Sequence, residues 1–196
     1  ASSSAAVIAY NTIAYNQAYN GGGVSLQDCS NLSLHHNVIA NNSASNWGGA
    51  IYHISTTGVM HNNLVANNSA TQRGGALYSN SSITLLNNTI ANNKANQMGG
   101  GIYSISCTPE LRNTILWGNT AGNGNQLYLY NNASSPNFYY CDIQGGSAAF
   151  GKPTGVLFTG QYYYNVNATP FFINASAGSG TDFDALTADF GLNSSS

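Results

Sequence analysis

The stretch GGAIY at Gly48–Tyr52 recurs along the chain at a nearly constant interval. It returns as GGALY at Gly74–Tyr78 and GGGIY at Gly99–Tyr103, with weaker copies GGGVS at Gly21–Ser25 and GNQLY at Gly124–Tyr128. The steps between copies are 27, 26, 25 and 25 residues. A fixed period of this length over five copies is the signature of a solenoid, in which every repeat stacks on its neighbours.

A second block, rich in asparagine, shares this period. NTIAYN at Asn11–Asn16 is followed by NVIANN at Asn37–Asn42, NLVANN at Asn63–Asn68 and NTIANN at Asn88–Asn93, and a weaker NTILWGN spans Asn113–Asn119. Short runs of Val, Ile, Leu, Thr and Tyr between Gly and Asn pairs are typical of strands joined by tight corners. Three such runs per period predict an all-β parallel β-helix of about six coils, stacked about 4.8 Å apart.

The shared period also predicts which side chains meet on adjacent coils. We expect two inward apolar rows, namely Ile13, Ile39, Val65, Ile90, Ile115 and Val24, Ile51, Leu77, Ile102, Leu127. We expect a corner row of amides that hydrogen-bond along the axis, formed by Asn42, Asn68, Asn93 and Asn119. Strand alternation turns a row of tyrosines outward as an exposed stripe, formed by Tyr52, Tyr78, Tyr103 and Tyr128. Stacking on sugar rings, burial against another protein and inward packing all remain open for this row.

The chain of 196 residues carries few charges, which excludes several classes of function. Charged residues make up 5% and the formal net charge is -2. Four scattered cations cannot neutralise a row of phosphates, so nucleic-acid binding is not expected. No run approaches 18 consecutive apolar residues, so no membrane insertion is expected. Cys29, Cys107 and Cys141 fit no zinc spacing, and three buried thiols are favoured over one disulfide with a leftover thiol.

The repeat fails after about Gly146. We therefore divide the chain into repeats at 1–146 and a C-terminal wrapping or capping segment at 147–196, which is rich in aromatic residues. The motif NTIxxN followed by GGGIY, together with Phe138–Gly146, Asn165–Phe172 and Asp189–Leu192, resembles the right-handed parallel β-helix repeat proteins of bacterial surfaces and secretions, including the chlamydial polymorphic outer-membrane type. This resemblance implies a right-handed solenoid and an extracellular or cell-surface location. It leaves the activity open, because enzymes and adhesins share the repeat.

The acidic residues do not form a recognisable catalytic set. Glycoside hydrolysis needs carboxylates that face each other, and a lyase needs carboxylates for Ca²⁺ with a basic residue nearby. Asp28 has no acidic partner one period further on, and Glu110 lies 32 residues before Asp142, so the two share no row. Arg73 and Arg112 are not in register either. We therefore expect no catalytic residues.

Two other groups of polar residues are candidate ion sites. Asp182, Asp184 and Asp189 cluster in the closing segment, where a solvated turn is favoured over a Ca²⁺ site. His35 and His61 lie one period apart, so their imidazoles meet on adjacent coils, but no third ligand is in register. A solvent-facing polar row is the favoured interpretation, so we expect no metal site and no cofactor.

These observations favour a non-enzymatic extracellular structural protein whose copies assemble head-to-tail into a surface fibre or layer. The first repeat begins within ten residues of the N-terminus, and an uncapped coil presents unpaired backbone groups to another strand. Low charge also removes the repulsion that keeps copies apart. One alternative is a carbohydrate-binding or adhesive β-helix within a larger surface protein, with glycans as partners. The other is a polysaccharide lyase or glycosidase.

Overall fold

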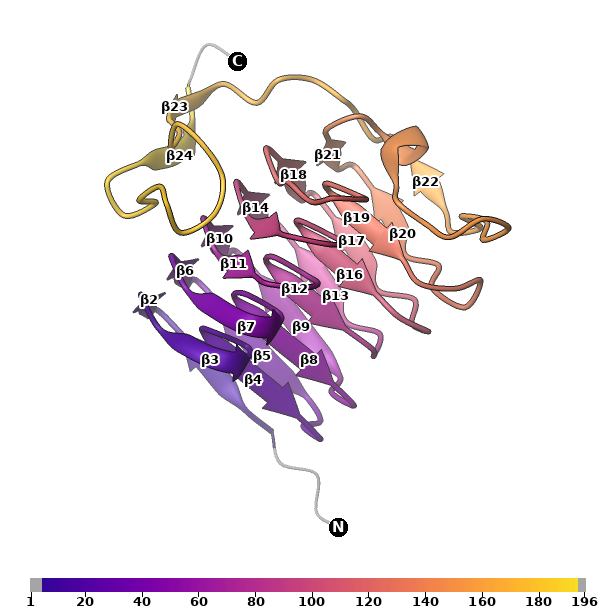
Figure 1. The fold of residues 1–196 in the computed structure, drawn as a ribbon, viewed down its shortest axis with the longest axis horizontal. Helices are drawn as coiled ribbons and strands as arrows, with labels where there is room; N and C mark the ends of the chain where they lie inside the picture. Colours follow the sequence, from indigo (N-terminus) through magenta and orange to yellow (C-terminus); the bar gives the residue numbers. More distant parts are fainter. Residues whose placement is uncertain (1–4, 194–196) are drawn as a thin grey trace.

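Successive repeats contribute parallel strands to sheets that run along a β-solenoid of about six turns (Figure 1). The computed structural model describes residues 5–193. The predicted all-β parallel solenoid is confirmed. The repeats supply four sheets rather than the three runs per period that the sequence indicates. The additional sheet is built from short strands such as Ser69–Ala70, whose small residues carry no strand signal.

The strands fall into four parallel sheets. Sheet A contains β1 (Val7–Ala9), β5 (Leu32–His35), β9 (Gly58–His61), β13 (Thr84–Leu86), β17 (Glu110–Arg112), β20 (Asn137–Tyr139) and β22 (Tyr162–Tyr163). Sheet B contains β2 (Thr12–Ala14), β6 (Val38–Ala40), β10 (Leu64–Ala66), β14 (Thr89–Ala91), β18 (Ile115–Trp117) and β21 (Asp142–Ile143). Sheet C contains β3 (Gln17–Asn20), β7 (Ser43–Trp47), β11 (Ser69–Ala70) and β15 (Lys94–Ala95). Sheet D contains β4 (Val24–Gln27), β8 (Ile51–Ile54), β12 (Leu77–Ser79), β16 (Ile102–Ser104) and β19 (Leu127–Leu129).

The inward rows follow the predicted register with one exception. The row that starts at Val24 runs through every predicted rung to Leu127. The other row runs through Ile13, Ile39, Val65 and Ile90 but then continues to Leu116. The prediction of Ile115 in this row is wrong, because the step into the fifth coil is one residue longer than the matching letters imply. Ile115 instead pairs with Thr89 and faces outward.

The Asn-Asn pairs between sheets A and B and between sheets B and C mark corners at which the first residue has positive φ and the second is buried. Asn41 has a φ of 54°, whereas Asn42 is fully buried and donates its amide to Asn68 Oδ1 at 3.0 Å. The predicted corner row continues from Asn68 to Asn93 and Asn119. A second ladder, which the sequence analysis did not single out, lies between sheets A and B and joins Asn11, Asn37, Asn63 and Asn88.

Glycine is required where sheet C turns into sheet D. Gly48 has a φ of 67°, which only glycine adopts without strain. A Cβ on Gly49 would lie 2.3 Å from the carbonyl oxygen of Gly75, so the coils could not approach each other with a larger residue. The repeated glycine pair is therefore fixed by corner geometry rather than by chemistry.

Strand pairing continues beyond residue 146, the predicted end of the repeats. After the 3₁₀ turn η1 (Ser147–Ala149), Gly151 bridges to Tyr128, β22 pairs with β20, and Val166 bridges to Asp142. This partial coil brings Phe150 and Phe158 against Phe138, where their rings close the C-terminal end of the core.

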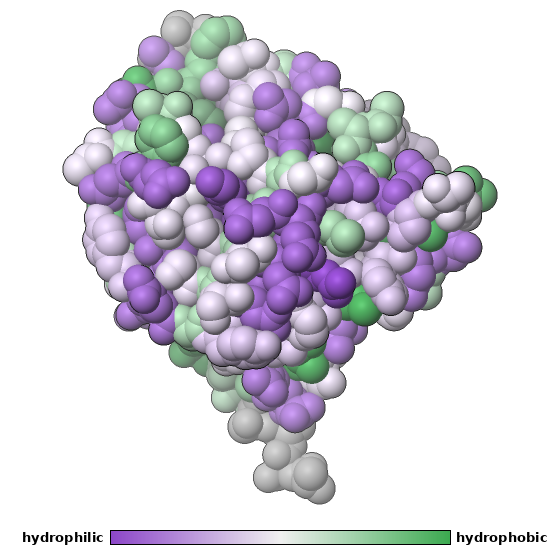
Figure 2. Space-filling view, viewed as in Figure 1, coloured by the Kyte–Doolittle hydropathy of each residue, from purple (hydrophilic) through white to green (hydrophobic). Residues whose placement is uncertain are grey.

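The remaining residues fold back along the solenoid as an antiparallel pair, β23 (Phe172–Asn174) and β24 (Asp189–Leu192) (Figure 1). The closing motif Asp189–Leu192 coincides with β24, whereas the motif Asn165–Phe172 ends at the first residue of β23, and Phe172 pairs with Leu192. Phe190 and Ala185 pack on the outer face of sheet B, against alanines that include Ala66. Figure 2 shows hydrophilic residues across the middle of the visible face and hydrophobic residues mostly towards its margins, including the region of this pair.

Two predictions about the chain as a whole can be compared with residues 5–193. All three cysteines are free thiols, and Cys107 and Cys141 are buried as predicted. The prediction of a buried thiol is wrong for Cys29, which is only half-buried. Within the same residues, no helix has the length and apolar character that a membrane span requires.

Candidate binding groove

The corner between sheets A and B presents one outward side chain per coil, each with positive φ. We call this the A–B corner row; it comprises Tyr10, His36, Asn62, Asn87, Asn113, Tyr140 and Tyr164, with φ values from 48° to 58°. Asparagine and histidine are enriched in this conformation, whereas tyrosine adopts it at a cost of about 1–3 kcal/mol. Bulky residues held in a costly conformation are candidates for a functional role.

The neighbouring corner between sheets B and C is covered. Its row includes Asn41, Asn67 and Asn92, and each of these amides donates to a carbonyl in the C-terminal segment. The hydroxyl of Tyr15 donates to Asp184 at 2.8 Å. The C-terminal segment therefore provides hydrogen-bond partners for the polar side chains of this corner, whereas those of the A–B corner row remain exposed to solvent.

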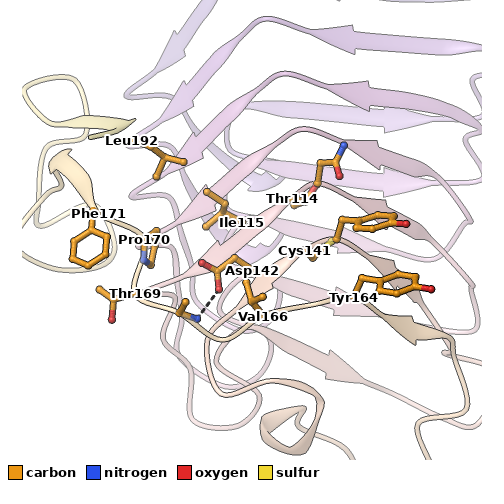
Figure 3. Close-up of a pocket in the computed structure, with 13 residues that line it drawn as sticks. Thr114, Ile115, Cys141, Asp142, Tyr164, Val166, Thr169, Pro170, Phe171 and Leu192 are labelled. Atoms are coloured by element: carbon orange, nitrogen blue, oxygen red, sulfur yellow. Dashed lines mark hydrogen bonds between the residues drawn. The ribbon is translucent and has the colours of Figure 1, made fainter. Parts of the chain in front are cut away.

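A hollow of about 510 Å³ lies on the outer face of sheet B near its C-terminal end. Its floor is formed by Ile115, Asp142 and Val166, which occupy one row on three successive coils. Figure 3 shows Tyr164 on one side of this floor and Phe171 on the other, where the chain arches away towards β23. This volume falls within the range of small-molecule sites.

A second hollow of about 410 Å³ continues along the same row. Its floor contains Leu64 and Thr89, which precede Ile115 in register. Asn62 and Asn87 of the A–B corner row form one side, and residues 188–191 form the other. We call the two hollows together the sheet B groove. Five rungs at about 4.8 Å per step give it a length of about 19 Å parallel to the solenoid axis.

Two exposed, stacked tyrosines lie at one side of the groove. The rings of Tyr140 and Tyr164 are stacked with centroids 5.1 Å apart and an interplanar angle of 9°. Their exposed fractions are 57% and 75%. Further along the row, the amide of Asn113 donates to Asn87 Oδ1 at 3.1 Å. The side of the groove thus has exposed aromatic rings at one end and an amide ladder further along.

Asp142 is the one acidic residue among the described residues that line the first hollow. Its carboxylate accepts a hydrogen bond from the backbone N–H of Ala168 at 3.1 Å, which ties the closing arch to the floor (Figure 3). Burial raises the pKa of Asp142 above its usual value, and the hydrogen bond from Ala168 opposes that shift. Asp189 lies along the second hollow and accepts from the N–H of Gly191. No Lys or Arg lines either hollow among the described residues.

The predicted exposed tyrosine stripe is wrong, because a second row of large side chains covers it. Tyr103 is fully buried, and its ring stacks between those of Tyr78 and Tyr128 at 5.3 and 5.4 Å. Trp47 leans along the axis and stacks on Tyr78 at 4.8 Å, and the guanidinium of Arg73 lies 5.3 Å from the centre of Tyr103. Tyr52 begins the stack and remains half-buried.

The acidic residues considered for catalysis lie apart in register. Glu110 belongs to a sheet A row with Asn137, whereas Asp142 belongs to sheet B. Glu110 pairs with Arg112 at 2.6 Å on the outer face of sheet A, and Arg112 lies over the ring of Tyr139. Asp28 is exposed at a corner of positive φ.

The residues considered as ion ligands form no three-ligand site. Within residues 5–193, no group of three or more His, Cys, Asp and Glu side chains is placed to hold a metal ion. One carboxylate oxygen of Asp184 accepts from Tyr15 and from the N–H of Leu186, so this group holds the closing segment to the first coil. His35 and His61 do stack on adjacent coils, with ring centroids 4.7 Å apart.

The groove residues do not follow from the repeat pattern, although the sequence carries one signal for them. Tyr139-Tyr140 and Tyr163-Tyr164 are doublets 24 residues apart, which is close to the repeat period. The opposite side of the groove had no such signal, because Phe171 and Leu192 belong to an aperiodic segment.

Parallel strands that pair in register on successive coils define a β-solenoid, and a groove runs along the outer face of its sheet B. A family model described as the right handed beta helix region matches residues 1–143. The chain therefore belongs to the right-handed β-helix family. Comparison with curated proteins and with solved structures gave no match.

Proposed function

We propose that this chain is a non-enzymatic, extracellular β-helix that binds a neutral polysaccharide along the sheet B groove. The observation that carries the proposal is the stacked, exposed pair Tyr140–Tyr164 at the side of a groove that runs along several coils. Flat aromatic faces bind the apolar faces of sugar rings, and the amides of Asn87 and Asn113 offer donors and acceptors for hydroxyl groups.

The charge of the groove favours a neutral ligand over an acidic one. Asp142 and Asp189 are the acidic residues among the described groove residues, and no basic side chain lines the groove. A polymer of uronates would meet like charge without a compensating cation, which lowers its affinity. This feature separates the proposal from the recognition of acidic polysaccharides.

The same composition supports a binding role rather than hydrolysis. Two carboxyl groups that flank one bond within about 5–10 Å are the usual requirement for glycoside hydrolysis. Asp142 is alone in the first hollow and is hydrogen-bonded to the backbone of Ala168. We therefore propose binding without cleavage.

A panel of neutral and acidic polysaccharides tests this function by affinity electrophoresis and calorimetry. We expect binding to at least one neutral polymer, with affinity reduced at least tenfold in both Tyr140→Ala and Tyr164→Ala. Tyr19→Ala is the matched control, because Tyr19 is equally exposed but lies on β3, outside the groove. A control that weakens binding as much as the groove variants would refute the assignment of the site.

Enzymatic action has its own test on the same polymers. Release of new reducing ends, or of unsaturated sugars, over a long incubation would contradict the non-enzymatic proposal. Loss of that release in Asp142→Asn would then identify the floor of the groove as catalytic.

Self-association is a second proposal, favoured by the surface of the first coil. Val7, Tyr15 and Tyr19 are exposed there, and the low charge of the chain gives little repulsion between copies. We propose a head-to-tail contact between the first coil of one copy and the closing coil of another. Electron microscopy and sedimentation at high concentration test it, and persistent monomers would contradict it.

We also propose that the chain is related to the polymorphic outer-membrane type and acts at a cell surface. The support is the pairing of the two closing motifs, Phe172 with Leu192, beyond a last coil that contains Phe138. Surface labelling of the source cells with an antibody against the folded chain tests this location.

A further inference from the structure

We infer that His35 and His36 form a chelating site for one divalent transition-metal ion of square-planar or tetragonal preference, such as Cu²⁺ or Ni²⁺. The site lies at the corner between β5 and β6, outside the two hollows of the sheet B groove. It uses the pair of adjacent residues rather than the stacked pair His35 and His61, which the repeat period indicated.

The distance between the two nitrogens sets the class of ion. The Nδ1 atoms of His35 and His36 share a hydrogen bond at 3.0 Å, whose proton a bound ion would displace, and their rings are nearly perpendicular at 88°. With metal–imidazole bonds of about 2.0–2.1 Å, this separation corresponds to an N–metal–N angle of about 94°. That angle matches cis positions of a square-planar or octahedral ion, whereas a tetrahedral ion would need a separation of about 3.3 Å.

The pair is already held in place before any ion binds. His36 has a φ of 53°, which turns its ring back over the corner. The ring of Tyr10 stacks on His36 with centroids 4.9 Å apart, and the amide nitrogen of Asn62 contacts His36 Nε2 at 3.3 Å. Ligands fixed by such neighbours lose little conformational freedom on binding, which favours affinity.

His61 stands beside the site without completing it. Its ring is parallel to that of His35 at 4.7 Å, and its Nδ1 contacts Asn62 rather than the other two histidines. A ring stacked at that spacing does not direct its nitrogen to an ion held between His35 and His36. The remaining coordination positions would therefore be filled by water.

The test is a calorimetric titration of the full chain with Cu²⁺ and, separately, with Zn²⁺ at pH 7.5 in a buffer that does not bind metals. We expect one Cu²⁺ per chain, bound at least tenfold more tightly than Zn²⁺. Electron paramagnetic resonance should show two nitrogen ligands. Equal affinity for the two ions would overturn the geometric assignment.

The repeat supplies variants that keep the fold. His36→Asn introduces the residue that Asn62 and Asn87 provide at the same corner, and His35→Leu introduces the residue that Leu86 provides in the same row. We expect each to weaken Cu²⁺ binding at least tenfold, whereas His61→Leu should change it less than threefold. Undiminished binding in His36→Asn would overturn the proposal and assign the copper to another group. A loss in His61→Leu as large as in His36→Asn would replace the pair by a three-histidine site.

Discussion

Two rows of planar side chains run along the outside of this solenoid, and they have opposite fates. The tyrosine stack that contains Tyr103 is buried beneath Trp47 and Arg73, whereas the A–B corner row remains open from Tyr10 to Tyr164. Both rows point away from the core of the coils. The strand period therefore determines that a side chain points outward. Whether that side chain is exposed depends on whether a neighbouring row of side chains covers it.

The two rows also differ in how regularly their residues repeat. The tyrosine stack repeats almost without change because its members pack on each other, and each substitution would disturb two neighbours. The A–B corner row varies from tyrosine to histidine to asparagine because its members face solvent. The most regular motif of the sequence is therefore structural, and the irregular row supplies the candidate sites.

The largest expected effect on stability comes from truncating a side chain in the buried tyrosine stack. Tyr103→Ala should lower the free energy of unfolding by about 4 kcal/mol, because it removes a fully buried ring from the stack. Tyr164→Ala, in the exposed row, should change it by less than about 0.5 kcal/mol. Urea denaturation followed by circular dichroism measures both values.

A matched control keeps the ring of Tyr103 and removes only its hydroxyl. That hydroxyl is buried and has no hydrogen-bond partner among residues 5–193, so Tyr103→Phe should be neutral or slightly stabilising. If Tyr103→Ala and Tyr164→Ala gave equal losses, the contrast between the two rows would be wrong.

The buried amide ladder should give the next largest effect. The side chain of Asn68 accepts from Asn42 and donates to Asn93 Oδ1 and to the carbonyl of Ile39. Asn68→Ala leaves these buried groups without partners and should cost about 3 kcal/mol. Asn87 of the open row is exposed, and Asn87→Ala should cost less than about 0.5 kcal/mol. Thermal unfolding of the two variants compares them directly, and similar losses would show that the ladder adds nothing beyond its exposed counterpart.

A buried histidine should have a smaller effect on stability, and this effect depends on pH. His53 is fully buried, and burial lowers its pKa to about 4 from the usual 6.5. The unfolded chain therefore binds more protons than the folded chain between these values, so stability falls as the pH drops from about 6.5 to 4. Between pH 7 and pH 5 we expect a loss of about 2 kcal/mol from this group.

Urea denaturation at both pH values measures this loss, and His53→Ser serves as the control because Ser79 occupies the same row on the next coil. An unchanged pH dependence in His53→Ser would show that other groups are responsible.

The sequence predicts the periodic part of the molecule far better than the aperiodic part. The period places Val24 under Ile51 and Asn42 under Asn68, because one residue per coil at a fixed step must meet its counterpart. It fails at Ile115, where a 26-residue step is hidden by the matching letters NTI. It also fails to show that Trp47 covers Tyr78, because that contact joins two rows rather than two copies of one row.

The groove could not be predicted because one of its sides is not repeated. The contact of Asn67 with the carbonyl of Gly178 joins residues 111 positions apart, which is no multiple of the period. Only the docked position of the C-terminal segment decides which corner is covered and which is open. Positive φ at Tyr140 and Tyr164 likewise has no signal in a single sequence, since tyrosine is unusual in that conformation.

The smallest predicted effect is a gain in stability. It concerns the coil at which the asparagine ladder between sheets A and B is interrupted. Thr114 occupies the position that asparagine holds on the preceding coils, and its hydroxyl accepts from the N–H of Asn88 at a long 3.4 Å. Asparagine has nearly the same volume and would add an amide donor for the carbonyl of Leu85, as Asn88 does for Met60. Thr114→Asn should therefore raise the free energy of unfolding by about 1 kcal/mol, measured by urea denaturation. A loss of stability would show that packing against the groove floor, rather than hydrogen bonding in the ladder, determines the preference for threonine at this position.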